Sequence, residues 1–238
     1  PLANRVGHDV NYIALTGALH AIGPADAPPP PPLNLVGDYG GGAMFLVAGV
    51  LAGLVGARRG GAGTVVDAAM TDGTINLLAM FHAFLASGRW QDRREANLLD
   101  GAMPFYRCYP CADGRFVAVG CLEPQFFAAF LAGLELDPAD WPQFDQARWP
   151  ALADAIAARF RSRPRDEWAA HFADTDACVT PVLSLGEAPG HPHNVARGSH
   201  VVAQGVTQPA PAPRFAGATP QIRPAVAAAA EEVLARWG

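Results

Sequence analysis

Three side chains able to exchange protons occupy the same kind of position in the sequence. His8, Asp38 and Glu123 each stand at or just before the start of an apolar stretch that is expected to be helical. Aspartate is a favoured N-cap, and proline, which follows Glu123, is a favoured first helical residue. Helix capping is therefore the simplest interpretation of the two carboxylates, and acid–base chemistry is the alternative.

The residues around Asp38 favour chemistry. The apolar run Leu-Asn-Leu-Val at 33–36 precedes it, and Gly40, Gly41 and Gly42 follow it, so that a ligand could come close to backbone N–H groups. Burial in apolar surroundings disfavours an ionised carboxylate, whereas the dipole of the following helix favours it. Proton transfer by Asp38 requires the effect of burial to prevail.

A helix over residues 10–22 is expected to position His8. Asp9 suits its N-cap, and Gly23-Pro24 suits its end. Five consecutive prolines at 28–32 then predict a stiff polyproline II linker. The sequence thus predicts that a linker separates the segment carrying His8 from the segment carrying Asp38.

A second apolar stretch, residues 39–57, follows Asp38. Its nineteen residues carry no charge, and Arg58 and Arg59 come directly after it. This length permits a membrane span. Because six glycines dilute the residues from 39 to 57 and no second span follows, the pattern favours a buried central helix and no membrane span.

The remaining pattern indicates an α/β chain with a second, smaller domain that begins near Gly101. Residues 64–70 are typical of a strand and 71–87 of a helix. Two strands, 105–108 and 115–119, are expected around the turn 112–114. Further helices are expected at 124–132, 149–161, 165–172 and 225–236.

Composition excludes several classes of function. The net charge is −5 and no basic run exceeds two residues, which argues against a nucleic-acid partner. Every basic residue among the 17 is arginine, so a P-loop lysine and a Schiff-base lysine are absent. The chain begins at Pro1 without a leader, so we expect a fragment with no signal peptide.

The cysteines and histidines outside these segments predict no metal centre. The sequence has four cysteines, which favour a reducing, cytoplasmic compartment over a disulfide framework. Cys108 and Cys111 form a C-x-x-C, but a turn follows it and a second ligand pair is missing, so free thiols are expected. His191 and His193 are expected in a solvated loop.

Four segments of the chain resemble the α-methylacyl-CoA racemases of the CoA-transferase family III superfamily. They are Gly-His-Asp at 7–9, residues 33–42 with Gly37 and Asp38, residues 66–73, and Glu-Pro-Gln at 123–125. The resemblance implies a partial Rossmann-like large domain in residues 1–100, a small α+β domain in 101–190, and a return to the large domain in 191–238. It also implies an interlocked homodimer in which each active site lies between two subunits.

What the resemblance implies for chemistry is racemisation of 2-methyl-branched acyl-CoA thioesters. His8 and Asp38 are then the two bases, and Glu123 is the partner of the histidine, in this subunit or the other. Asp9, Tyr12, Asn34 and Gly37 are expected to bind substrate, and the backbone N–H of Asp9 is a donor to the enolate oxygen. Coenzyme A is part of the substrate, and neither a cofactor nor a metal is expected.

Two alternatives stay open. A family III CoA-transferase would use Asp38 as a nucleophile that forms a mixed anhydride, without a second base such as His8. The other is a non-catalytic dimerisation module left by truncation, or a membrane-associated fragment built on residues 39–57. The family that the chain resembles has a longer N-terminal half that supplies much of the coenzyme A contact. For this reason we expect these residues alone to bind coenzyme A weakly.

Overall fold

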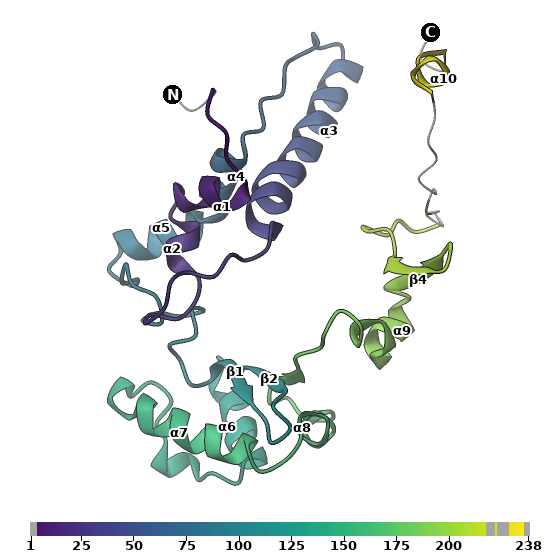
Figure 1. Cartoon of the computed structure of the whole chain (residues 1–238). Helices are drawn as coiled ribbons and strands as arrows, with labels where there is room; N and C mark the ends of the chain where they lie inside the picture. The colour runs from purple at the N-terminus through teal and green to yellow at the C-terminus, as the bar shows by residue number, and fades with distance from the viewer. Residues whose placement is uncertain (1–3, 218–221, 223–228, 236–238) are drawn as a thin grey trace. The chain divides into compact units, whose positions relative to one another are not determined.

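The computed structural model describes residues 4–217, 222 and 229–235. Contacts divide the chain into two compact units, Pro1–Pro181 and Val182–Gly238. The first unit carries every candidate site residue. Each unit is described by itself below, with the element labels of Figure 1.

Two short helices, α1 (Asp9–Ala14) and α2 (Ala18–Ala21), replace the single helix expected over 10–22. Gly17 has a φ of +88° and breaks the helical path. The hydroxyl of Thr16 donates to the carbonyl of Ile13 at 2.7 Å and accepts from the N–H of Ala18 at 3.2 Å, which satisfies the backbone at the break. His8, not Asp9, is the N-cap of α1.

Asp38 lies inside a π-helix, η1 (Leu35–Ala43), rather than before a helix as expected. The N–H of Tyr39 donates to the carbonyl of Asn34, five residues earlier, at 3.2 Å. The chain then continues directly into α3 (Met44–Arg58). Wide turns of this kind are rare, and they occur frequently at functional sites.

The expectation that this apolar stretch forms a buried central helix is wrong for the described chain, because no residue of α3 is buried. Leu35–Arg58 is long and apolar enough to cross a membrane by length and composition alone, and 6% of its most apolar window is buried. Hydrophobicity predicted the helix but not what covers it. Its exposed apolar side chains include Leu46, Val50 and Leu54.

Residues 64–69 form no strand, contrary to expectation; they run as an extended segment alongside α3 (Figure 1). A Cβ on Gly49 would lie 2.6 Å from Cγ1 of Val66, so the segment packs directly on the helix backbone. No neighbouring strand pairs with it in the described part of this unit, and an extended segment without a ladder is not a strand.

The helix expected over 71–87 is present as α4 (Met70–Leu77) and α5 (Ala79–Ala86), with a break at Leu78. Helix α4 crosses η1 at two glycines. A Cβ on Gly73 would collide with the carbonyl oxygen of Gly41, and a Cβ on Gly41 would lie 2.7 Å from the backbone N of Thr74. This crossing fixes the π-helix against α4.

The hairpin predicted after Gly101 is confirmed as β1 (Tyr106–Pro110) and β2 (Phe116–Gly120), which pair antiparallel. Strand β3 (Val179–Pro181) adds to β2, so the sheet order is β1-β2-β3. The three helices predicted between β2 and β3 are also confirmed, at nearly the expected bounds: α6 (Pro124–Gly133), α7 (Trp149–Phe160) and α8 (Arg165–Phe172). Short 3-10 turns η2 (Pro138–Asp140) and η3 (Gln146–Arg148) connect α6 to α7.

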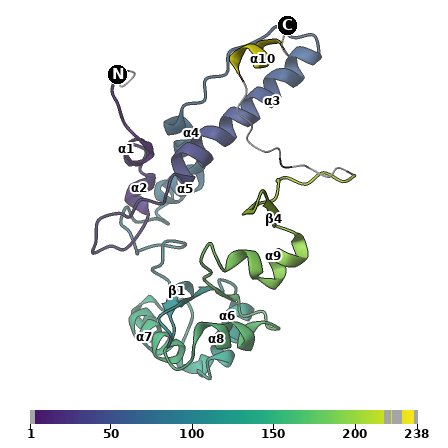
Figure 2. The same cartoon turned by 45° about the vertical axis from the view of Figure 1, so that its right-hand side comes forward.

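These helices and the sheet enclose the main hydrophobic core (Figure 2). Tyr109, Val117 and Val119 point from the sheet into this core. Because side chains alternate along a strand, the residues between them point to the opposite face. That second face is not covered by α6, α7 or α8 and lines a cavity described below.

The second unit holds a 3-10 turn η4 (Ala188–Gly190), helix α9 (Pro192–Arg197) and a hairpin of β4 (His200–Ala203) with β5 (Val206–Pro209). Helix α10 (Ala230–Ala235) falls within the helix expected at 225–236. Residues 225–228 and 236 of that expected helix lie outside the described residues.

Candidate active site

One hydrogen bond joins the segment that carries His8 to the π-helix that carries Asp38. Oδ2 of Asp9, the first residue of α1, accepts the backbone N–H of Asp38 at 2.7 Å. His8 directly precedes Asp9, so the two candidate bases lie in segments linked by this contact. The sequence predicted Asp9 as a helix N-cap and a substrate-binding residue whose backbone N–H donates to the enolate oxygen, but not this contact with the backbone of Asp38.

The contact depends on a glycine. A Cβ on Gly37 would lie 2.8 Å from Cγ of Asp9 and 2.8 Å from Cγ2 of the buried Ile13, and it would also contact Oδ2 of Asp9. Only hydrogen fits there, so Gly37 allows the carboxylate of Asp9 to reach the backbone of the π-helix. Gly37 therefore has a packing role in addition to its expected place at the substrate site.

The side chains of His8 and Asp38 are both exposed, and so open to a ligand. Nδ2 of Asn34 lies 3.3 Å from Oδ2 of Asp38 and can donate to it. The N–H of His8 donates to Oδ1 of Asn11 at 3.1 Å, which holds the backbone at the start of α1. The burial that was expected to favour proton transfer by Asp38 is absent in this chain.

Tyr12 is half-buried beside these residues. Its ring lies 3.1–3.2 Å from where a Cβ on Gly7 would stand. With Ala69, Met70 and Thr71 it lines a small cavity of about 260 Å³. Tyr12 thus lies where α1 meets the start of α4.

Glu123 lies elsewhere in the unit, as the N-cap of α6. Its exposed side chain makes no capping hydrogen bond, so capping does not explain it. No hydrogen bond or ion pair of residues 4–217 joins it to His8. The structure therefore assembles Asp9, Asn34, Gly37 and Asp38 around the N-terminus of α1 but does not bring Glu123 to them within one chain.

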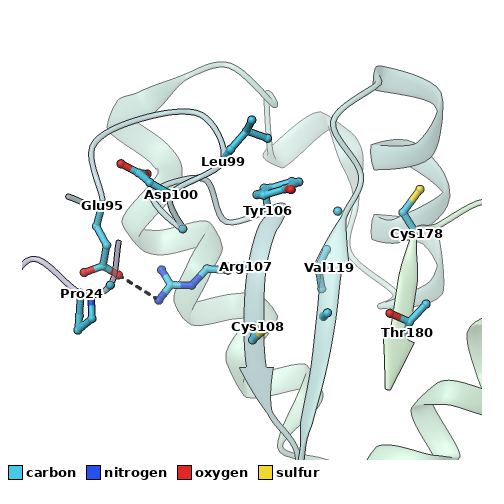
Figure 3. A pocket seen from close by; sticks show the side chains of 14 residues that line it. Pro24, Glu95, Leu99, Asp100, Tyr106, Arg107, Cys108, Val119, Cys178 and Thr180 are labelled. Carbon is cyan, nitrogen blue, oxygen red and sulfur yellow. Dashed lines mark ion pairs between the residues drawn. The ribbon is translucent and has the colours of Figure 1, made fainter. Parts of the chain in front are cut away.

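A cavity of about 700 Å³ lies against the second face of the sheet (Figure 3). Its floor comes from Tyr106 and Cys108 of β1, Ala118 and Gly120 of β2, and Thr180 of β3. The remaining lining residues are Gly23, Pro24, Glu95, Leu99, Asp100, Gly101, Arg107, Val119 and Cys178. Small and apolar side chains dominate the floor, which suits an apolar ligand.

Glu95 joins two walls of this cavity. Its Oε2 accepts the N–H of Ala25 at 2.9 Å, and its Oε1 lies 3.8 Å from the guanidinium of Arg107, the pair drawn in Figure 3. The neighbouring Arg94 donates from three nitrogens, at 2.8–3.0 Å, to the carbonyls of His20, Pro24 and Ala27. The loop before the prolines is therefore fixed to residues 94–95.

Glu123 influences this cavity electrostatically. Partial loss of solvent around the sulfur, and then the negative charges of Glu123 and Asp176, raise the pKa of the Cys178 thiol above its usual value, although the residue is exposed. Burial is also the main cause that raises the pKa of Cys121 to about 12. Since Cys178 lines the cavity, the carboxylate of Glu123 acts close to the cavity wall.

Sequence reasoning missed the cavity residues. The alternation of side chains in the predicted hairpin could have placed Tyr106, Cys108 and Ala118 on one face. Nothing in the local pattern indicates that Glu95 and Arg94 bind the loop at 20–27, because these contacts join residues about 70 positions apart.

All four cysteines are free thiols; Cys111 and Cys121 are buried, whereas Cys108 and Cys178 are exposed. Among the described residues no group of three or more His, Cys, Asp or Glu side chains is arranged to hold a metal ion.

Comparisons with known proteins agree with this architecture. A model of CoA-transferase family III matches residues 1–230. The chain is 41% identical over 238 residues to an alpha-methylacyl-CoA racemase of Mus musculus, and 38% identical to the Homo sapiens protein of that name. Each alignment covers 98% of this chain and 62% of the relative, so the chain spans about three fifths of these relatives' length. A CaiB/BaiF family protein from Brucella suis shares the fold, with a TM-score of 0.72 and 24% identity, over 92% of this chain and 58% of that one.

Proposed function

Because the chain belongs to CoA-transferase family III, with its family III fold and mixed helices and sheets, we propose that it acts as a racemase of 2-methyl-branched acyl-CoA thioesters. The observation that carries the proposal is the hydrogen bond from Asp38 N–H to Asp9, which joins the segments of an imidazole and a carboxylate. The relatives named alpha-methylacyl-CoA racemase support the same assignment.

Inversion of the carbon next to a thioester carbonyl needs a base on each face. One base removes the α-proton, and the conjugate acid of the other returns a proton to the opposite side. In one direction neutral His8 accepts the proton and protonated Asp38 donates one; in the other direction the roles are exchanged. Coenzyme A serves as a handle on the substrate, and the reaction uses neither metal nor organic cofactor.

The intermediate enolate needs stabilisation, because each pKa unit between the carbon acid and the base corresponds to about 1.4 kcal/mol. The backbone N–H of Asp9 is the proposed donor. It lies in the first turn of α1, directly after His8, and no hydrogen bond of the described residues uses it. Asn34, next to Asp38, orients that carboxyl group.

The proposal assigns the acyl chain to the large cavity on the sheet face. A volume of about 700 Å³ and an apolar floor suit a branched hydrocarbon chain. Since no hydrogen bond or ion pair among residues 4–217 joins Glu123 to His8, we assign the cavity and Glu123 of one subunit to His8 and Asp38 of the other. The active site is then completed by a homodimer.

Exchange at the α-carbon tests the proposal. Incubation of one enantiomer of a 2-methylacyl-CoA in heavy water should give both enantiomers, each with deuterium at the α-position. If the protein incorporates no deuterium from either enantiomer, the racemase assignment is wrong.

The second candidate is a CoA-transferase, since an exposed carboxylate such as Asp38 can also act as a nucleophile on a thioester. His8 distinguishes the two activities, because a transferase needs no base on the opposite face. Hydroxylamine should give no hydroxamate at Asp38 after incubation with acyl-CoA. Trapping of an acyl group on that residue would favour the transferase.

A further inference from the structure

We propose that Asp9 is a positioning residue: its carboxylate holds Asp38 in the orientation that proton transfer requires. This inference rests on the proposed racemase function and assigns to Asp9 a side-chain role distinct from the backbone role given above. The starting observation is that Asp9 is only 9% exposed, although it stands in the first turn of a helix, where aspartate usually faces solvent.

The two oxygens of this carboxylate are used unequally. Oδ2 accepts the N–H of Asp38 at 2.7 Å, whereas Oδ1 is buried and has no hydrogen-bond partner within the described residues. A buried carboxylate that is only half satisfied costs free energy, so it contributes poorly to stability. Groups kept in such an unfavourable state are often retained for function.

The contact acts on the residue that carries the chemistry. The N–H that Asp9 binds belongs to Asp38 itself, in the first turn of the π-helix, and Nδ2 of Asn34 lies 3.3 Å from Oδ2 of Asp38. Asp9 thus holds the backbone of Asp38, and Asn34 holds its carboxyl group. Gly37 allows the approach, because a Cβ at that position would lie 2.8 Å from Cγ of Asp9. Three features of the chain therefore converge on the placement of one carboxyl group.

A ratio of two exchange rates tests the role without depending on total activity. One enantiomer loses its α-proton to His8 and the other to Asp38, so deuterium incorporation from each reports on one base. In Asp9→Ala we expect incorporation through Asp38 to fall about a hundredfold, because a displacement near 1 Å has an effect of that size. Incorporation through His8 should change severalfold at most.

Asp9→Asn and Asp137→Ala are the matched variants. The amide of asparagine can still accept the Asp38 N–H, so Asp9→Asn should recover most of the ratio. Asp137 also accepts one backbone N–H, that of Ala139 at 2.9 Å, but at the exposed start of the turn η2. Asp137→Ala should therefore leave the ratio of the two exchange rates unchanged. Equal losses through both bases in Asp9→Ala, or no recovery in Asp9→Asn, would overturn the proposal.

Amide hydrogen exchange separates a failure of this inference from a failure of the racemase assignment. In Asp9→Ala the protection of the Asp38 amide should fall at least tenfold, while α6 and α7 keep theirs. This readout needs no substrate. If the wild-type protein shows no α-proton exchange but the Asp38 amide loses protection, the racemase assignment fails and the contact stands; unchanged protection refutes the positioning role directly.

Discussion

Gly41 and Gly73 meet backbone to backbone where η1 crosses α4, and the carbonyl oxygen of Gly41 occupies the space that a Cβ on Gly73 would need. Gly73→Ala should therefore destabilise the protein by about 1–3 kcal/mol, since overpacking forces backbone shifts of that cost. Chemical denaturation measures the difference. Gly56→Ala is the control: nothing lies within 4 Å of its Cβ position, so the change should stabilise α3 by up to about 1 kcal/mol.

The proposed bases predict specific losses. His8→Ala and Asp38→Ala should each reduce racemisation by a factor of about 10² to 10⁴, because that is what one positioned acid or base contributes. Glu123→Ala should keep a rate reduced by about 10 to 100-fold, since it acts on the reaction through His8. Racemisation is measured from chiral product ratios. A His8→Ala enzyme as fast as the wild type would exclude His8 from the reaction.

The cavity predicts a dependence on chain length. Ala118→Leu adds apolar volume to the floor on β2 and should raise KM about tenfold for long-chain 2-methylacyl-CoA substrates while leaving a short-chain substrate unaffected. Ala147→Leu, at an exposed site in η3, is the control and should change neither value. Equal effects of Ala118→Leu on short and long chains would argue against the cavity as the acyl site.

Thiol labelling tests how close Glu123 is to the cavity wall. Partial loss of solvent around the sulfur and the charges of Glu123 and Asp176 raise the pKa of Cys178. The reactive thiolate is therefore scarce at neutral pH and increases only as the pH rises above the usual thiol range. Glu123→Gln removes one of the charges and lowers this pKa, so alkylation of Cys178 at pH 8 should become severalfold faster. Mass spectrometry measures it. Glu135→Gln, in the loop after α6, is the control and should leave the alkylation rate of Cys178 unchanged. An unchanged rate in Glu123→Gln would show that Glu123 does not act on Cys178.

The exposed apolar surface of α3 predicts self-association. If subunits pair over this surface, Leu54→Glu buries an unpaired charge and should weaken the dimer at least tenfold in sedimentation experiments. Arg59→Glu, at the end of the same helix, tests for a general effect of charge and should have little influence. A wild-type protein that stays monomeric at high micromolar concentration would contradict the dimer.

Local signals in the sequence were sufficient for much of the fold. The Ala-Asp-Gly turn at 112–114 predicted the hairpin, and amphipathic spacing predicted α7 and α8. The break at Gly17 was missed, because an isolated glycine fits a helix or interrupts it depending on tertiary contacts. The strand expected at 64–70 failed for a similar reason: strand propensity was present, but the segment packs on α3 instead of pairing with a strand.

The sequence named a set of candidate site residues but not their geometry. Resemblance selected His8, Asp38 and Glu123, whereas the reach of the Asp9 side chain across 29 positions could not be inferred from periodicity. The wide turn around Asp38 could not be predicted from the sequence either, since its glycines fit a loop, an ordinary helix or a π-helix. Which residues belong together in a second subunit stays a prediction.

The wide turn at Leu35–Ala43 sets the rotation, about the helix axis, of the residues around Asp38 relative to α3. One residue of an α-helix corresponds to a rotation of about 100°. Removal of a single glycine from 40–42 would tighten the turn to ordinary spacing and rotate everything before it relative to α3. Asp38 would then leave the side that meets Asp9, while the outer surface of α3 kept its orientation. The wide turn thus allows one continuous helix to turn the backbone N–H of Asp38 toward Asp9 while the apolar side chains of α3 stay exposed.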